Sequence, residues 1–482
     1  MKRCQARVVH YARNAAGTGW AATGTDVSDF IDYQSSQSLE VSADTFQIVL
    51  KNTTDLPNPI SPDDRFDFFA ANTENGLKIG ETTDDYDNYF LFNGTVEEVK
   101  TDISRSGDRR LIIQGASASQ VMLRVLLPLG QYNTGTVSVD NQNLQPTPPN
   151  VIRSLLEFLN QNNPAGRQII WNSSNPLVKS DLSAFPSVSY STNYKPLYQI
   201  IMDLSTSAMT ADGDYYFYVK VSNTGTNELI WRKKELTVVQ GTDLVEGTDF
   251  SVVSVPYGAW DLTNHCIVHC GQDAENHGIL THWYGVQKQG LISAGTRSKY
   301  IPTSLSGQIM SLESTKSGSQ YVFSGRYPAS YPFWSAWQPK SSDAVDLKEP
   351  NLFSGNKLYN RLSFVNYAGG DYRVICNNDS DFNFFLKRAA RLNGKRLAKT
   401  VVETYGYVKF KLMCKLYKGS VGFTLGGLYR PTIYTYGWQL SGTTETRKYL
   451  RLSDIKHTIG KDGWNTTLEF EQDALALNKQ VT

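Results

Sequence analysis

The sequence has no long apolar segment and almost no net charge. No run of about 18 or more apolar residues occurs among the 482 residues, so we predict no transmembrane helix. The N-terminal stretch has basic residues but no continuous apolar core, so it does not resemble a signal peptide. The net charge of +1 gives no overall attraction to nucleic acid or to membranes.

Cysteine is scarce, with five residues in an odd and scattered set: Cys4, Cys266, Cys270, Cys376 and Cys414. A disulfide framework needs paired cysteines in an oxidising compartment. The sequence therefore predicts free thiols in a protein made in a reducing cytoplasm.

The most metal-like motif is NHCIVHC at residues 264–270. Its flanks have the pattern of a β-strand, which places His265 and His269 on one face and Cys266 and Cys270 on the other. Structural zinc needs four ligands that converge on one ion, which this arrangement prevents. We therefore predict no metal site here, and no cofactor elsewhere.

Recognisable catalytic motifs are also missing. The sequence has no G-x-S-x-G elbow, no H-E-x-x-H zinc motif, no P-loop and no dinucleotide-binding fingerprint. Carboxylates are plentiful, but the sequence marks out no pair of them for glycoside hydrolysis. We predict that the protein is not an enzyme.

What the sequence does contain is aromatic residues and strand patterns. Hydrophobic residues make up 40% of the chain, with 27 Tyr, 21 Phe and 9 Trp, which is typical of a globular protein. The length predicts about three or four domains.

The clearest strand pattern is the β-hairpin expected over residues 449–471. Apolar residues alternate on both sides of the turn GKDG at residues 460–463, and period two is the mark of a half-buried strand. The alternation shifts phase near Ser453 and Asp454, which predicts a β-bulge because one extra residue turns later side chains to the other face.

A fainter copy of this hairpin lies at residues 96–116. The matching positions are Val99, Ile103 and Gly107 in the first copy and Ile455, Ile459 and Gly463 in the second. We predict that one β-module occurs twice, with the apolar members in the core of each barrel and the glycines in the turns.

The expected fold is mainly β with α+β: two related antiparallel β-barrel modules, a small α+β domain and a β-rich insertion. The first module covers residues 1–127, and the α+β domain, with two amphipathic helices and a hairpin, covers 128–248. The second module comprises 249–270 and 381–482 and is interrupted by an irregular β insertion at 271–380. A further helix is expected over 382–402.

This order of modules resembles the baseplate hub, or tail hub, family of bacteriophages and related contractile injection systems. Four stretches carry the resemblance: residues 26–52 followed by DDRFDFF, LFNGTVEEVKTDISRSGDRRLIIQGASA, PLYQIIMDLSTSAMTADGDYYFYVK and RLSDIKHTIGKDGWNTTLEF. The insertion at 271–380 departs from the shorter connections of that family.

The resemblance implies a structural virion protein of the tail baseplate, made in the host cytoplasm. It implies a homotrimer whose two barrels per chain form a six-barrel ring, which joins the six-fold tail tube to the three-fold central spike or fibre. The implied partners are the tail tube protein, the spike or fibre protein, the tape-measure protein and other baseplate proteins, with DNA passing through during ejection.

Basic residues on one side of the expected 382–402 helix have two interpretations. The residues are Arg388, Arg391, Lys395 and Lys399. They could line the tail lumen and face DNA or the tape-measure protein. A charged stripe is also the ordinary exposed face of an amphipathic helix.

An aromatic cluster in the insertion also has two interpretations. Its members are Tyr331, Phe333, Trp334 and Trp337. Aromatic residues are enriched in subunit interfaces, which we favour here. The alternative function is a receptor-binding or carbohydrate-active phage tail protein, for which a screen of glycan binding or polysaccharide cleavage would be decisive.

Overall fold

The computed structural model describes most of the N-terminal half of the chain and the C-terminal strands. The described residues are 4–14, 19–27, 30–39, 44–51, 59–72, 90–103, 109–128, 131–132, 137–144, 146–161, 167–175, 190–208, 214–222, 226–235, 244–258, 262–272, 278–284, 297–302, 313–317, 320–325, 362–367, 371–376, 409–434, 449–461 and 463–472, with a few isolated positions besides.

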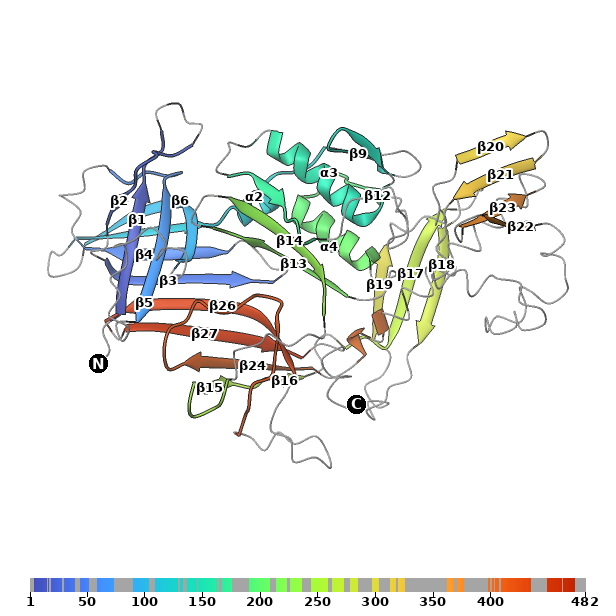
Figure 1. Cartoon of the computed structure of the whole chain (residues 1–482). Coiled ribbons are helices and arrows are strands. Elements are labelled where there is room, and N and C mark those ends of the chain that lie inside the picture. The colour runs from blue at the N-terminus through green and yellow to red at the C-terminus, as the bar shows by residue number, and fades with distance from the viewer. Residues whose placement is uncertain are drawn as a thin grey trace.

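The fold is mainly β and is organised around one 13-stranded sheet (Figure 1). Its N-terminal strands are β1 (Cys4–Tyr11), β2 (Thr25–Asp26), β3 (Phe30–Ser38), β4 (Thr45–Leu50), β5 (Arg65–Asn72), β6 (Phe90–Ile103) and β7 (Arg109–Ala116). Its later strands are β15 (Phe250–Ser254), β16 (Tyr257–Gly258), β24 (Lys409–Leu416), β25 (Leu428–Tyr429), β26 (Leu450–Gly460) and β27 (Gly463–Glu471). The path through the sheet is β15-β24-β27-β26-β3-β4-β7-β6-β5-β1-β2, so both ends of the chain contribute to one continuous sheet.

Alternation of apolar and polar residues explains why these segments form strands. In β27, Trp464, Thr466, Leu468 and Phe470 are buried while every intervening residue is partly exposed. In β4 the buried positions alternate in the same way. A strand with this pattern buries one face and leaves the other in contact with water.

The bulge predicted near Ser453 is confirmed. The pairing of β26 with β27 shifts register between Leu452 and Asp454, so Ser453 is the extra residue. Its hydroxyl donates to the carbonyl oxygen of Glu469 at 3.1 Å, and its own carbonyl accepts from the Leu39 amide at 2.9 Å.

The α+β part lies against the large sheet. Its helices are α2 (Ser119–Arg124), α3 (Pro148–Gln161) and α4 (Leu197–Ala208). Its strands are β8 (Gln131–Tyr132), β9 (Val137–Val139), β10 (Gln142–Leu144), β11 (Ile169–Trp171), β12 (Tyr190–Ser191), β13 (Tyr215–Lys220) and β14 (Asn227–Lys233). The predicted helices with their apolar stripes, and the predicted hairpin of β13 and β14, are confirmed.

Two smaller sheets contain the remaining described strands. These strands are β17 (His265–Gln272), β18 (Gly278–Tyr284), β19 (Ser298–Pro302), β20 (Glu313–Ser317), β21 (Gln320–Gly325), β22 (Leu362–Tyr367) and β23 (Asp371–Cys376). We expected residues up to 270 to belong to the second module. Instead, β17 pairs with β18 on one edge and with β19 on the other. It is therefore the central strand of a separate three-stranded sheet.

The large sheet folds over at its N-terminal end, so that its own strands β5 and β1 lie across β3 and β4 (Figure 1). Phe68 of β5 packs on Tyr33 of β3, with ring centroids 4.4 Å apart, and on Phe46 of β4 at 5.0 Å. Offset and tilted aromatic pairs of this kind add to the free energy gained by burial. One face of the sheet is therefore covered by apolar packing, while the opposite face carries mainly polar and charged side chains, together with Val49 and Ile112.

No helix in the described part of the chain is long and apolar enough to cross a membrane.

Ile459 should be essential to this packing. It is 7% exposed and belongs to the apolar cluster of the N-terminal strands. We expect Ile459→Asp to lower the free energy of unfolding by about 3–5 kcal/mol, because it buries a carboxylate without a partner. The measurement is denaturant-induced unfolding. Lys461→Ala, an exposed position in the adjoining turn, should change stability by less than about 0.5 kcal/mol, and equal effects of the two would contradict the packing described.

Candidate interaction site: a repeated strand unit with open edges

The large sheet contains the same arrangement of five antiparallel strands twice. The N-terminal unit has the spatial order β3-β4-β7-β6-β5, and the C-terminal unit has the order β15-β24-β27-β26-β25. In each unit the last two strands along the chain form a hairpin, β6–β7 or β26–β27. Its second strand pairs with the second strand of the unit, and its first strand pairs with the third strand along the chain, β5 or β25.

The two units also agree in register. Paired residues run across the N-terminal unit through Val99, Ile113, Ile48 and Tyr33, and across the C-terminal unit through Ile455, Leu468, Cys414 and Val252. The bulges correspond as well, because β6 shifts register between Val96 and Glu98 as β26 does between Leu452 and Asp454. The hairpin similarity in the sequence therefore has a counterpart in the backbone.

The turn that leads into the fifth strand is the same in both units. The Asp63 amide donates to the Val96 carbonyl, and the Gly426 amide donates to the Leu452 carbonyl, both at 2.9 Å. Asp63 has φ 73° and Gly426 has φ 74°. Positive φ favours glycine and is tolerated by aspartate, so both sequences permit this turn.

The units join where β26 pairs with β3. The register runs from Asp454 opposite Ser38 to Ile459 opposite Tyr33, and we call this pairing the seam. At one end the Ser38 hydroxyl donates to the Asp454 carboxylate. Figure 1 shows the red strands β26 and β27 beside the blue strands β3 and β4.

The seam explains a difference between the matched residues of the two hairpins. Ile455 and Ile459 are buried, at 5% and 7% exposure, whereas Val99 is only partly buried and Ile103 is 60% exposed. The expectation that Ile103 lies in a barrel core is therefore wrong for the single chain. Ile459 is covered because β3 continues the sheet beside β26, whereas β6 has no such neighbour along Glu98–Ile103 among the described residues.

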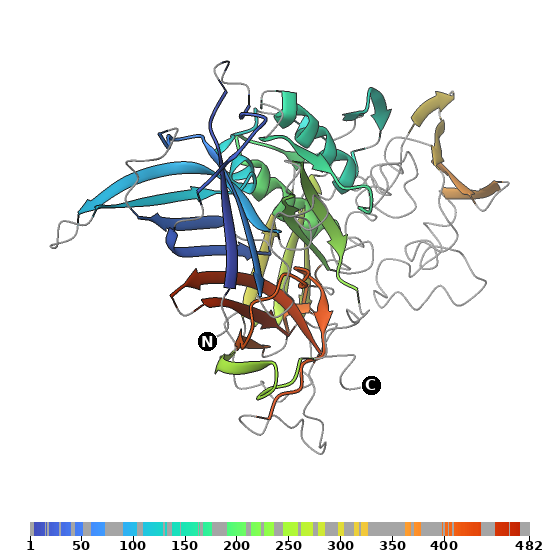
Figure 2. The same ribbon diagram turned by 60° about the vertical axis from the view of Figure 1, so that its left-hand side comes forward.

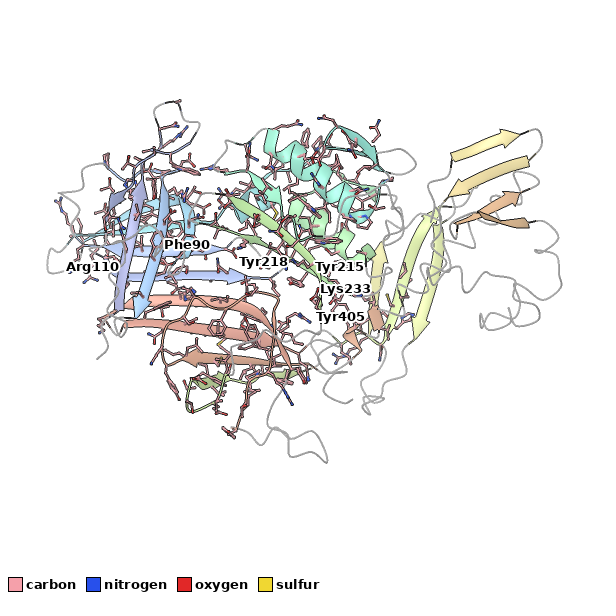
Figure 3. All side chains as sticks on the ribbon, in the orientation of Figure 1. Phe90, Arg110, Tyr215, Tyr218, Lys233 and Tyr405 are labelled. Carbon is pink, nitrogen blue, oxygen red and sulfur yellow. The ribbon has the colours of Figure 1, made fainter. Side chains whose placement is uncertain are left out.

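Two strand edges are consequently open in the part of the chain that the structure describes. The first is Glu98–Ile103 of β6, since β5 pairs with β6 only up to Thr95. The second is Ser251–Ser254 of β15, which has β24 on its other side. Figure 2 shows the light blue hairpin of β6 and β7 extending away from the rest of the molecule, and Figure 3 places Arg110 toward its outer end. Open edges are ready to pair with another strand.

Several candidate residues from the sequence lie outside the described residues. They are Gly107, the basic positions Arg388, Arg391, Lys395 and Lys399, and the aromatic positions Tyr331, Phe333, Trp334 and Trp337. Gly463 is described, and it begins β27 with φ 94° at the hairpin turn.

The NHCIVHC motif lies in a strand, as predicted from its flanks. His265 and Cys266 are both buried, and the His265 Nδ1 atom is 2.7 Å from the Ser298 hydroxyl. Burial raises the pKa of the Cys266 thiol to about 11, so this thiol is protonated at neutral pH. The described residues contain no cluster of three His, Cys, Asp or Glu side chains suited to a metal ion.

The fold defined by these strands is a mainly antiparallel β protein with an internal repeat. No family model matches the chain, and no curated protein matches it.

Solved structures similar to the chain include phage tail proteins and a secretion-system component. A 43 kDa tail protein of prophage MuSo2 from Shewanella oneidensis is 8% identical, with 97% of this chain and 98% of that chain covered and a TM-score of 0.49. A tail protein from Neisseria meningitidis MC58 is 10% identical, with 98% of each chain covered and a TM-score of 0.49. An E. coli component of the type VI secretion system is 8% identical, with 92% of this chain and 73% of that chain covered and a TM-score of 0.39. Identities of 8% to 10% with TM-scores below 0.5 do not establish a function for this chain.

We expect the buried Asp44 to make the free energy of unfolding depend on pH. Its carboxylate accepts from the Ser38 amide at 3.1 Å, yet burial raises its pKa to about 8, and the nearby Asp454 adds to the rise. Between pH 3.8 and about 8 the folded protein holds a proton that the unfolded chain has released, so the free energy of unfolding falls as pH rises. We expect Asp44→Asn to remove this slope and to be more stable than the wild type at pH 8 by at least about 1.4 kcal/mol. Urea unfolding from pH 5 to 9 measures it, and parallel slopes for the two proteins would refute it.

His457 should make the free energy of unfolding fall as the pH is lowered, which is the opposite of the effect of Asp44. It is 4% exposed beside Trp464 and Thr466, and burial lowers its pKa from 6.5 to about 4. Below about pH 6.5 the imidazole binds a proton in the unfolded chain but not in the folded chain. The free energy of unfolding therefore decreases as the pH falls from 7 toward 4. The loss should be roughly 3 kcal/mol. His457→Gln should flatten acid unfolding, and an unchanged acid limb would contradict the assignment.

Proposed function

We propose that this protein is a structural component of a bacteriophage tail: a trimeric hub in which three chains close a ring of six repeated units. The observation that carries the proposal is the contrast between Ile459 and Ile103. These residues occupy equivalent positions, yet one is buried at a seam between units and the other lies on an open edge.

The seam within the chain provides the template for the contact between chains. In the C-terminal unit, residues Asp454–Ile459 of β26 pair with the first strand of the next unit, β3. The corresponding segment in the N-terminal unit is Glu98–Ile103 of β6. By the same rule its partner is β15, the first strand of the C-terminal unit in the neighbouring chain. A head-to-tail contact of this kind forms a closed ring if the rotation closes, and open filaments if it does not.

The exposed apolar side chains support this pairing. Ile103 on the first open edge is 60% exposed, and Val253 on the second is 55% exposed. Both would be removed from water in the ring, and each buried apolar side chain contributes about 1.5–3 kcal/mol. The ring would also satisfy the backbone hydrogen bonds of both edges.

The symmetry of such a ring suits a protein that joins a six-fold structure to a three-fold one. Three chains with two units each would present six similar surfaces to a six-fold tail tube, while keeping three-fold symmetry for a central spike or fibre. The proposed partners are therefore the tube protein, the spike or fibre protein, the tape-measure protein and other baseplate proteins in the virion, with DNA passing through the ring. This role needs no catalysis.

The first test is to block the open edge. We expect Ile103→Lys to weaken the trimer by at least about tenfold in dissociation constant per interface, equal to about 1.4 kcal/mol, because a charge replaces an apolar contact. Each chain should still fold as before, since Ile103 is exposed in the single chain. Val253→Lys should have the same effect from the opposite edge. Sedimentation and native mass spectrometry over a range of concentrations give the mass.

The matched control is Ile170→Lys, which alters an isoleucine of β11 that is 42% exposed and lies on neither open edge. It should leave the mass unchanged. A wild-type protein that remains a monomer inside assembled tails, or a particle containing six chains, would refute the proposal. Equal effects of Ile103→Lys and Ile170→Lys would refute the proposed contact.

A further inference from the structure

The polar face of the large sheet has an uncharged row across its centre. We define the polar face as the outward side of the strands, opposite the apolar clusters. Cross-strand neighbours from six consecutive strands form the row: Glu98, Gln114, Gln47, Gln34, Thr458 and Asn465. Apart from Glu98, every member is an amide or a hydroxyl, and the row crosses the seam without interruption.

One hydrogen bond links two neighbours in this row, and Gln34, Gln47 and Glu98 are exposed to solvent. The Gln114 amide donates to the Gln47 side-chain oxygen at 3.3 Å. A depression of about 300 Å³ over the seam is lined by Gln34, Gln47 and Asn465, with Asp32 and Lys461 also in its lining, and it leaves room for water. Hydrated amides offer hydrogen bonds but no net charge.

Two lysines of the polar face form ion pairs with carboxylates on the same face. Lys100 pairs with Glu98 at 2.7 Å, and Lys411 pairs with Glu469 at 3.2 Å. Lys456 lies two residues from Asp454 on the same side of β26, since alternate residues of a strand share a face. The charges of Lys100 and Lys411 are therefore balanced by carboxylates beside them.

In the proposed ring, this face would have to point inward. The opposite face carries β1 and β5, which pack on the N-terminal strands, and the apolar clusters that include α3 and α4. These packed elements are too large to fit inside a closed ring of strands, so they must lie on its outside. The polar face, which carries no further layer in the described part of the chain, is the side that fits the channel.

We infer that the polar face is the channel wall of the hub, and that its amide and hydroxyl row lets a polymer with a phosphate backbone pass without being retained. This inference rests on the proposed trimer. Binding to DNA depends on cations that neutralise phosphates and release counterions, so a wall of neutral, hydrated groups binds such a polymer weakly. The row contributes a surface for passage and not for recognition.

The test adds cations to the row. The variant Gln34→Lys, Gln47→Lys, Gln114→Lys places three lysines on neighbouring strands. We expect the wild-type trimer to show no saturable binding to a fluorescent duplex DNA at about 50 mM salt. The variant should bind at least about tenfold more tightly, and the slope of log K against log salt should steepen by about 2 to 3. Phage assembled with the variant should release DNA more slowly.

The matched control carries the same added charge on the α+β part: Gln142→Lys, Asn143→Lys, Gln161→Lys, all exposed positions of β10 and α3. It should leave DNA release unchanged and bind duplex DNA less tightly than the row variant. Masses are measured first for all three proteins. If the wild type is trimeric but both variants release DNA at the same rate, or if the wild type itself binds DNA saturably, the inference fails and the hub stands. If no trimer forms, the hub proposal fails and the inference fails with it.

Discussion

The hydrogen bonding of strand edges is the constraint on which this structure depends. Each strand in a sheet needs a partner on both sides, or an edge that water can reach. At the seam the chain meets this requirement by pairing its penultimate strand, β26, with its third, β3, more than 400 residues earlier in the sequence. That pairing joins the two units and buries Ile459, and the α+β part packs against both units.

The repeat explains features that would otherwise look unrelated. The bulges of β6 and β26, the two turns with positive φ at Asp63 and Gly426, and the aligned strand registers are the same local solutions used twice. Bulges increase twist and bend a strand away from its neighbour. The bulges therefore place this local bend at the same point in both units.

The units differ where their surroundings differ. The C-terminal hairpin lies against the N-terminal unit, so Ile459, His457 and Trp464 form part of a core. The N-terminal hairpin ends in exposed residues, including Ile103. The same strand geometry thus produces a buried contact in one place and a solvent-exposed edge in the other, and the proposed subunit contact follows from that difference.

The sequence by itself determined the local elements: the hairpin over residues 449–471, its bulge at Ser453, the helices α3 and α4 and the mainly β character. Period-two and 3.6-residue patterns report which face of a segment is apolar, so they reveal strands, helices and phase shifts. Such patterns contain no information about partners distant in the chain. Only the tertiary structure decided that β26 pairs with β3, that β17 belongs to a separate sheet, and that Ile103 is exposed while the equivalent Ile459 is buried. The physical reason is that burial depends on what covers a side chain, and a neighbouring strand can come from any part of the sequence.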